Sequence, residues 1–225
     1  YNKDETSCNI YVMRGDGSNI RRLSVTKDGD YLPHALDDGS IAYTRWEYQE
    51  RGWANIQSVW VVRPDGTGAD ALFKQHFNDP WALEDVRSIP GSKKLVAVAA
   101  GHHTLAAGPV VRIDVRRGMN NPAGIEIVTP GVIPPEGGMS GACVPEGGVR
   151  GVGGYFMHPW ALSEKTFLTA FAYCKGRSGG CTTEIDPAGY AIYLIDVYGT
   201  MELVYRDPAI SCFVPIPLRP RKRPP

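Results

Sequence analysis

Short apolar runs separated by polar turns make up most of this chain. β-Branched, aromatic and small apolar residues gather in stretches such as 41–46, 59–62, 95–100 and 167–172, with Gly, Pro, Asp and Ser between them. Runs of this length bounded by turn-forming residues are typical of β-strands, and no stretch of ten or more residues has helical spacing. The pattern predicts an all-β fold.

One unit of this pattern repeats along the chain. Residues 10–23 align with residues 59–72 without a gap, and both contain an apolar stretch, an Arg, an Asp-Gly pair and a final Leu. Looser copies occupy 110–128 and 192–205. Asp-Gly supplies the positive φ that a tight hairpin turn requires. Each copy is therefore predicted to be a β-hairpin.

A second kind of unit precedes three of these hairpins. Residues 36–43, 89–98 and 162–170 each run from an apolar residue through a polar turn into an apolar strand. Together the two units give four strands in a period of about 50 residues, which is the signature of β-propeller blades. The sequence predicts a partial propeller of about three and a half to four blades.

The period divides the chain into blades and connections. We expect the propeller to occupy 1–208, with 209–225 as the start of a further blade and a Pro/Arg-rich segment. The expected parts of 1–208 are a partial blade at 1–24, blades at about 31–73, 77–128 and 156–206, and a rim loop at 131–155.

Several segments carry a family resemblance. Residues 33–43, followed by 59–66, resemble the TolB-type, WD-like propeller repeat. More narrowly, 36–48, 88–91, 158–165 and 215–221 are similar to bacterial proteins related to the hydrazine synthase alpha subunit, and Thr44 to Tyr48 is the most distinctive part. The resemblance spans nearly the whole chain. It implies a six-bladed propeller within a larger extracytoplasmic protein, so that the remaining blades of the parent chain are one partner.

Charge and hydropathy narrow the classes of partner. Lys and Arg total 24, as do Asp and Glu, so the formal net charge is zero and nothing favours nucleic acid as a partner. No run approaches the roughly 20 apolar residues that cross a bilayer, so no membrane span is expected. The chain begins at Tyr1 without a Met, and we interpret it as a piece of a longer protein.

Two groups of residues are candidates for ligand contacts at the channel or rim. His34 and His158 lie next to the expected first strands of two blades, which line the central channel, and they could face it from neighbouring turns. They could hold a ligand or a metal of unknown identity, or bond to loop backbone. Arg45, Trp46 and Glu47 place a cation, an aromatic ring and an anion in succession. They could contact a ligand or form a structural ion pair between blades.

Other chemistry finds little support. Cys174 and Cys181 flank a Gly/Ser-rich loop, so they could form a disulfide across a hairpin or remain free thiols. Ser140 lacks the strand–turn–helix context of a nucleophile elbow. Residues 151–154 lack the spacing of a phosphate loop, and the chain has no Cys-x-x-Cys-His haem site. We therefore expect no catalytic residue and no cofactor within these residues.

Three hypotheses on function follow. The first is a non-catalytic scaffold or binding module that contacts a protein partner or small ligand at the rim or channel. The second, implied by the resemblance, is the propeller domain of a multi-haem redox enzyme whose haem sites lie outside this stretch. The third is the propeller cap of a serine hydrolase. Fold resemblance alone does not transfer an activity.

Overall fold

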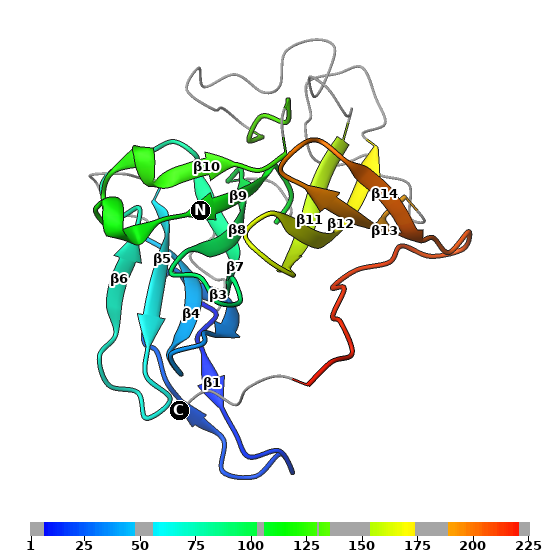
Figure 1. The fold of residues 1–225 in the computed structure, drawn as a ribbon. Helices are drawn as coiled ribbons and strands as arrows, with labels where there is room; N and C mark the ends of the chain where they lie inside the picture. Colours follow the sequence, from blue (N-terminus) through cyan, green and yellow to red (C-terminus); the bar gives the residue numbers. More distant parts are fainter. Residues whose placement is uncertain are drawn as a thin grey trace.

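The computed structural model of the chain describes residues 7–47, 56–102, 106–129, 131–135, 154–173 and 189–220. Within these ranges the secondary structure consists of strands β1 to β14 and two short 3-10 helices, with no α-helix (Figure 1). The all-β prediction is therefore confirmed. In the described part of the chain no helix could span a bilayer.

The strands form a hairpin followed by three antiparallel groups of four. The hairpin pairs β1 (Tyr11–Val12) with β2 (Arg21–Arg22). The first group contains β3 (Gly29–Ala35), β4 (Ile41–Trp46), β5 (Gln57–Val62) and β6 (Asp70–Phe73). The second contains β7 (Ala82–Ser88), β8 (Leu95–Ala100), β9 (Val110–Ile113) and β10 (Ile125–Ile127). The third contains β11 (Gly154–Ala161), β12 (Thr166–Tyr173), β13 (Ala191–Asp196) and β14 (Met201–Tyr205).

Each group runs in chain order from its first strand to its last, as in a propeller blade. The short helices η2 (Val115–Arg117) and η3 (Pro122–Gly124) lie in the β9–β10 connection. A single parallel pair, Gln57 with Ala82, joins the first and second groups into one sheet. These open sheets fit a partial propeller, and Figure 1 shows the groups following one another from blue through green to orange.

The aligned hairpins have the same turn. The Arg14 N–H donates to Ser18 O at 2.9 Å, and the Arg63 N–H donates to Thr67 O at 2.9 Å. Gly17 and Gly66 both have positive φ, at 83° and 91°. The ungapped alignment of 10–23 with 59–72 is therefore confirmed by their local geometry.

The core lies between successive groups of strands. One cluster joins the first group to the second through Val59, Leu83 and Val111. Another joins the second to the third through Val96, Phe156 and further aromatic residues. Apolar burial between β-sheet faces is the main stabilising term of such an arrangement.

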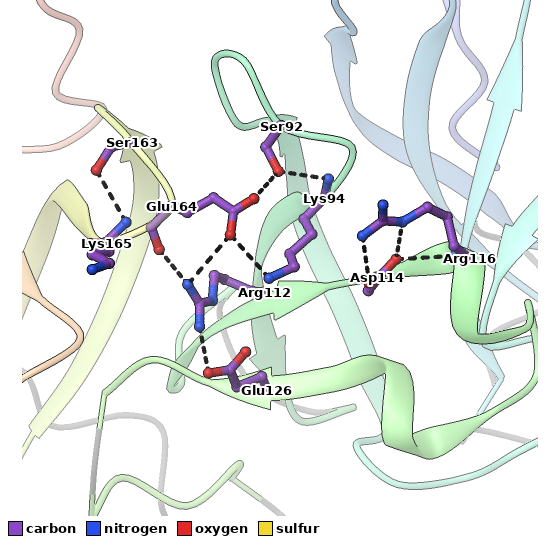
Figure 2. A network of polar contacts seen from close by, with 9 residues as sticks. All are labelled: Ser92, Lys94, Arg112, Asp114, Arg116, Glu126, Ser163, Glu164 and Lys165. Carbon is purple, nitrogen blue, oxygen red and sulfur yellow. Dashed lines mark hydrogen bonds and ion pairs between the residues drawn. The ribbon is translucent and has the colours of Figure 1, made fainter.

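A polar network also crosses the border between the second and third groups (Figure 2). The Glu164 carboxylate accepts hydrogen bonds from Ser92 Oγ and from Lys94 Nζ, the latter at 3.0 Å. Arg112 donates to the Glu164 carbonyl at 2.5 Å and also bonds Glu126. The turn before β12 is thereby held against the β7–β8 turn and β9.

Candidate functional site

The first strand of every group carries the same irregularity. Each has a shift in its pairing register, which marks a β-bulge. The shifts fall between Tyr31 and His34, between Glu84 and Arg87, and between Met157 and Trp160. Bulges re-aim side chains, and here they bring polar side chains from β3, β7 and β11 towards one another.

A non-glycine residue with positive φ lies inside each bulge. These residues are Leu32, Asp85 and His158, with φ of 53°, 55° and 51°. Such a conformation costs roughly 1–2 kcal/mol for a residue with a Cβ, and strained positions of this kind cluster at functional sites. Val214, at φ 51° before Pro215, repeats the arrangement of His158 before Pro159. Residues 213–216 therefore resemble the first strand of a fourth group.

A cavity of about 1250 Å³ lies between these first strands and the C-terminal segment. Its polar and aromatic walls come from His34, Arg87, Trp160 and Arg219. Its apolar walls include Leu36, Pro90, Val214 and Ile216. We call it the larger cavity.

Asp85 lies behind the larger cavity and holds two of its wall residues. Its side chain is 1% exposed, whereas those of His34 and Arg87 are 24% and 11% exposed. Its Oδ1 bonds to His34 Nε2 and lies 3.1 Å from Arg87 Nη2. Burial raises the pKa of Asp85, but the hydrogen bond from His34 and the charge of Arg87 outweigh it and lower the pKa overall.

Arg87 also contacts an aromatic wall. Its guanidinium carbon lies 5.2 Å from the centre of the Trp160 ring, which is a cation–π geometry. Three buried polar atoms of the cluster have no hydrogen-bond partner among the described residues: Asp85 Oδ2, Arg87 Nε and His158 Nδ1. Buried polar groups are normally paired, so this cluster has unused capacity for a polar guest.

The structure brings His34 and His158 together around Asp85. The His34 ring lines the larger cavity and bonds to the Asp85 carboxylate. A bond to loop backbone was the alternative expected from the sequence. His158 packs edge-on against Phe213, with ring centres 5.7 Å apart, and burial lowers its pKa. In the described part of the chain, no group of three or more His, Cys, Asp or Glu could hold a metal ion.

Arg45, Trp46 and Glu47 separate into different surroundings. Arg45 forms a two-bonded ion pair with Asp30 at 2.7 and 2.8 Å and lies 4.2 Å from the Trp60 ring centre. This ion pair joins β3 to β4 within one group of strands. Glu47 accepts a hydrogen bond from Gln75. The three residues therefore do not form one ligand site.

Trp46 instead lines a second cavity of about 440 Å³, which we call the smaller cavity. Its other walls are Tyr31, Leu32, Gln57, Glu84, His102 and Ala106. Glu84 is 5% exposed, and burial raises its pKa to about 8. The smaller cavity thus has a buried carboxyl where the larger one has cationic walls.

Sequence reasoning missed Glu84, Asp85 and Arg87. They lie in β7, and the available signal was three charged residues inside a strand flanked by apolar residues. Cys174 and Cys181, the predicted disulfide, lie outside the described residues, as does most of the predicted rim loop. Within the described ranges Cys8 and Cys212 are free thiols.

Comparisons with known proteins support the architecture. No known protein family matches the chain, and no curated protein matches it either. A solved structure of Kuenenia stuttgartiensis hydrazine synthase is similar, with 14% sequence identity and a TM-score of 0.57. The match covers 84% of this chain and 21% of that one, so this chain spans about a fifth of that protein. At this identity the similarity shows the fold alone.

Proposed function

We propose that this chain is part of a propeller-type binding module whose larger cavity binds a small organic anion with an apolar body. The observation that carries the proposal is the presentation of Arg87 and His34 at the cavity by the buried Asp85 carboxylate. A side chain held by a buried partner is preorganised, which lowers the cost of binding.

The walls of the larger cavity support this ligand class. Arg87 and Arg219 are cations at the wall, and His34 adds a ring N–H or a further charge when protonated. Asp37 also lines the cavity, at an exposed position. Leu36, Pro90, Val214 and Ile216 provide apolar surface for the rest of the ligand. Cavities with mostly apolar walls and a few placed polar groups are the usual form of small-molecule sites.

The proposal includes the wider architecture. Three complete groups of strands, a preceding hairpin and a fourth positive-φ residue at Val214 support a propeller with more blades than this chain contains. We propose a six-bladed, TolB-like propeller in a larger extracytoplasmic protein. The structural similarity to hydrazine synthase makes a domain of a redox enzyme the second candidate, in which the same module would serve as a scaffold.

Benzoate is a suitable probe because it combines a carboxylate with an apolar ring. The 225-residue chain is titrated with benzoate and, separately, with benzyl alcohol, while amide and indole NMR signals are followed. We expect saturable shifts at Arg87 and Trp160 with benzoate. A hydrogen bond to a charged group is worth about 1.5–3 kcal/mol, so benzyl alcohol should bind about ten-fold or more weakly.

Variants separate the cavity from general charge effects. Arg219→Gln should weaken benzoate binding without loss of folding, because Arg219 is exposed. Arg116→Gln is the matched control, since Arg116 pairs with Asp114 away from the cavity. Equal effects of the two substitutions, or no saturable shift with benzoate, would overturn the proposal.

A further inference from the structure

The smaller cavity forms a second site with different chemistry. We propose that it binds a small organic ammonium ion, with Glu84 as the counter-ion and Trp46 and Tyr31 as aromatic walls. This site shares no lining residue with the larger cavity, so the inference stands independently of the proposed function.

Glu84 is the group that would bind the cation. Its side chain lies at the cavity wall and is almost fully buried. Within the described residues Glu84 takes part in no ion pair, and the neighbouring charge is the Asp85 carboxylate, which raises the Glu84 pKa further. A buried carboxyl without a cation stays protonated near neutral pH. A bound ammonium ion would provide the missing opposite charge.

The remaining walls favour an organic cation over a metal ion. Trp46 and Tyr31 offer aromatic surface, and the faces of such rings attract cations. Leu32 and Ala106 add apolar surface that suits alkyl groups. His102, 5.1 Å from Trp46 between ring centres, is already oriented by aromatic contacts. Aromatic walls around a carboxylate are a recurring means of recognising alkylammonium groups.

A chain of hydrogen bonds leads away from Glu84. The Glu84 carboxyl bonds to the Tyr31 hydroxyl, which bonds to Gln57 Oε1. Gln57 Nε2 lies 2.7 Å from His102 Nδ1. When Glu84 is protonated, each hydrogen bond of this series is donated in the direction from Glu84 towards His102. Nδ1 of His102 is then the last acceptor.

Ionisation of Glu84 reverses this direction. The Tyr31 hydroxyl then donates to the carboxylate, the Gln57 amide turns to donate to Tyr31, and His102 Nδ1 becomes the donor. Binding of a cation should therefore move the His102 proton from Nε2 to Nδ1. The groups facing Glu84 are Tyr31 on β3 and Asp85 on β7, and the series of hydrogen bonds connects it further to Gln57 and His102.

Tetramethylammonium tests the inference because it cannot lose a proton. The 225-residue chain is titrated with tetramethylammonium chloride, with tert-butanol as an uncharged compound of similar size. We expect saturable binding of the cation only, and an affinity that falls about ten-fold for each pH unit below 8, since a proton must leave Glu84. The ¹⁵N signals of His102 should report the change of tautomer.

Substitutions distinguish Glu84 from the protein's other carboxylates. Glu84→Gln keeps a hydrogen-bonding group of the same shape and should reduce tetramethylammonium binding at least ten-fold and abolish its pH dependence. Glu202→Gln, at an exposed position on β14, should change neither. Equal binding by Glu84→Gln and the native chain, or equal binding of tert-butanol, would overturn the inference. Benzoate binding at the larger cavity should be unaffected by Glu84→Gln, so the two proposals can fail separately.

Discussion

Glu84 and Asp85 are neighbours in β7 with almost the same burial, but their surroundings differ. Asp85 is bonded to His34 and lies 3.1 Å from an Arg87 nitrogen, and its pKa is lowered. Glu84 has the Tyr31 hydroxyl as its partner, and burial raises its pKa to about 8. The Asp85 carboxyl is thus ionised at neutral pH, and the Glu84 carboxyl is largely protonated.

The difference shows that placement of cations, rather than depth of burial, decides the charge of a buried carboxyl in this protein. The bulge in β7 makes the difference possible, because it places Asp85 at φ 55° and directs it towards the larger cavity. Glu84 faces the smaller cavity. Two adjacent acidic residues therefore prepare two cavities for opposite charges.

The strongest test of this contrast is Asp85→Asn. The substitution keeps the shape of the side chain but leaves Arg87 and His34 without their anion. Breaking a buried ion pair typically costs about 3–5 kcal/mol, and we expect a loss of about 3 kcal/mol in the free energy of unfolding. Urea unfolding at pH 7 measures it.

Asp114→Asn is the control for this experiment. Asp114 pairs with Arg116 at 2.7 Å, but the Arg116 side chain is largely exposed, so the loss should be much smaller. A loss for Asp85→Asn no larger than that for Asp114→Asn would show that the buried cluster contributes nothing special.

Glu84 should make the stability of the folded protein decrease as the pH rises. Its pKa is about 8 in the folded protein and about 4.5 when unfolded, so between these values the folded state binds more protons. Stability from this group is therefore full below pH 4.5 and falls as the pH rises towards 8, with each unit of pKa difference worth on the order of 1.4 kcal/mol. Glu84→Gln should remove this decline, which urea unfolding at pH 5, 6 and 7 would reveal.

Lys74 sets the upper limit of that pH range. It is fully buried and donates to Trp81 O at 2.9 Å, and burial lowers its pKa to about 7. Above pH 7 its folded form loses a proton that the unfolded chain keeps up to about 10.5, so this group increases stability with rising pH. A pH 5–7 profile identical in the native chain and Glu84→Gln would contradict the assignment of Glu84 as a protonated buried acid.

The sequence predicted the scaffold better than the cavities. The turn at Gly66 and the strand at 95–100 could be predicted because local chemistry determines them: Asp-Gly favours a tight turn and an apolar run favours a buried strand. His34 and His158 were expected in turns beside the first strands, whereas they lie within β3 and β11. The bond between His34 and Asp85 could not be predicted, because it depends on bulges and on packing between residues 51 positions apart.

The same distinction applies to the segment 45–47. Three adjacent residues of complementary chemistry suggested one site, but successive side chains of a strand point to opposite faces. Arg45 accordingly pairs with Asp30, while Trp46 reaches the smaller cavity. Spacing along a strand therefore indicated which residues could be functional, but not which of them would meet.

Glu164 provides a third carboxylate for comparison and the smallest expected effect. Its pKa is lowered, mainly by the hydrogen bond from Ser92 and also by Lys94 and Arg112, but its side chain is 41% exposed (Figure 2). Exposed pairs are screened by water and salt and are worth about 0.2–1 kcal/mol. Glu164→Gln should therefore lower the free energy of unfolding by less than about 1 kcal/mol, and by still less in 1 M NaCl, as urea unfolding at both salt concentrations would show. Asp85→Asn should lose nearly the same amount at both salt concentrations, because the Asp85 carboxylate is 1% exposed and salt screens a buried pair much less than an exposed one. A loss for Glu164→Gln that is as large and as insensitive to salt would mean that water and salt screen the Glu164 pairs no more than they screen the buried Asp85 pair.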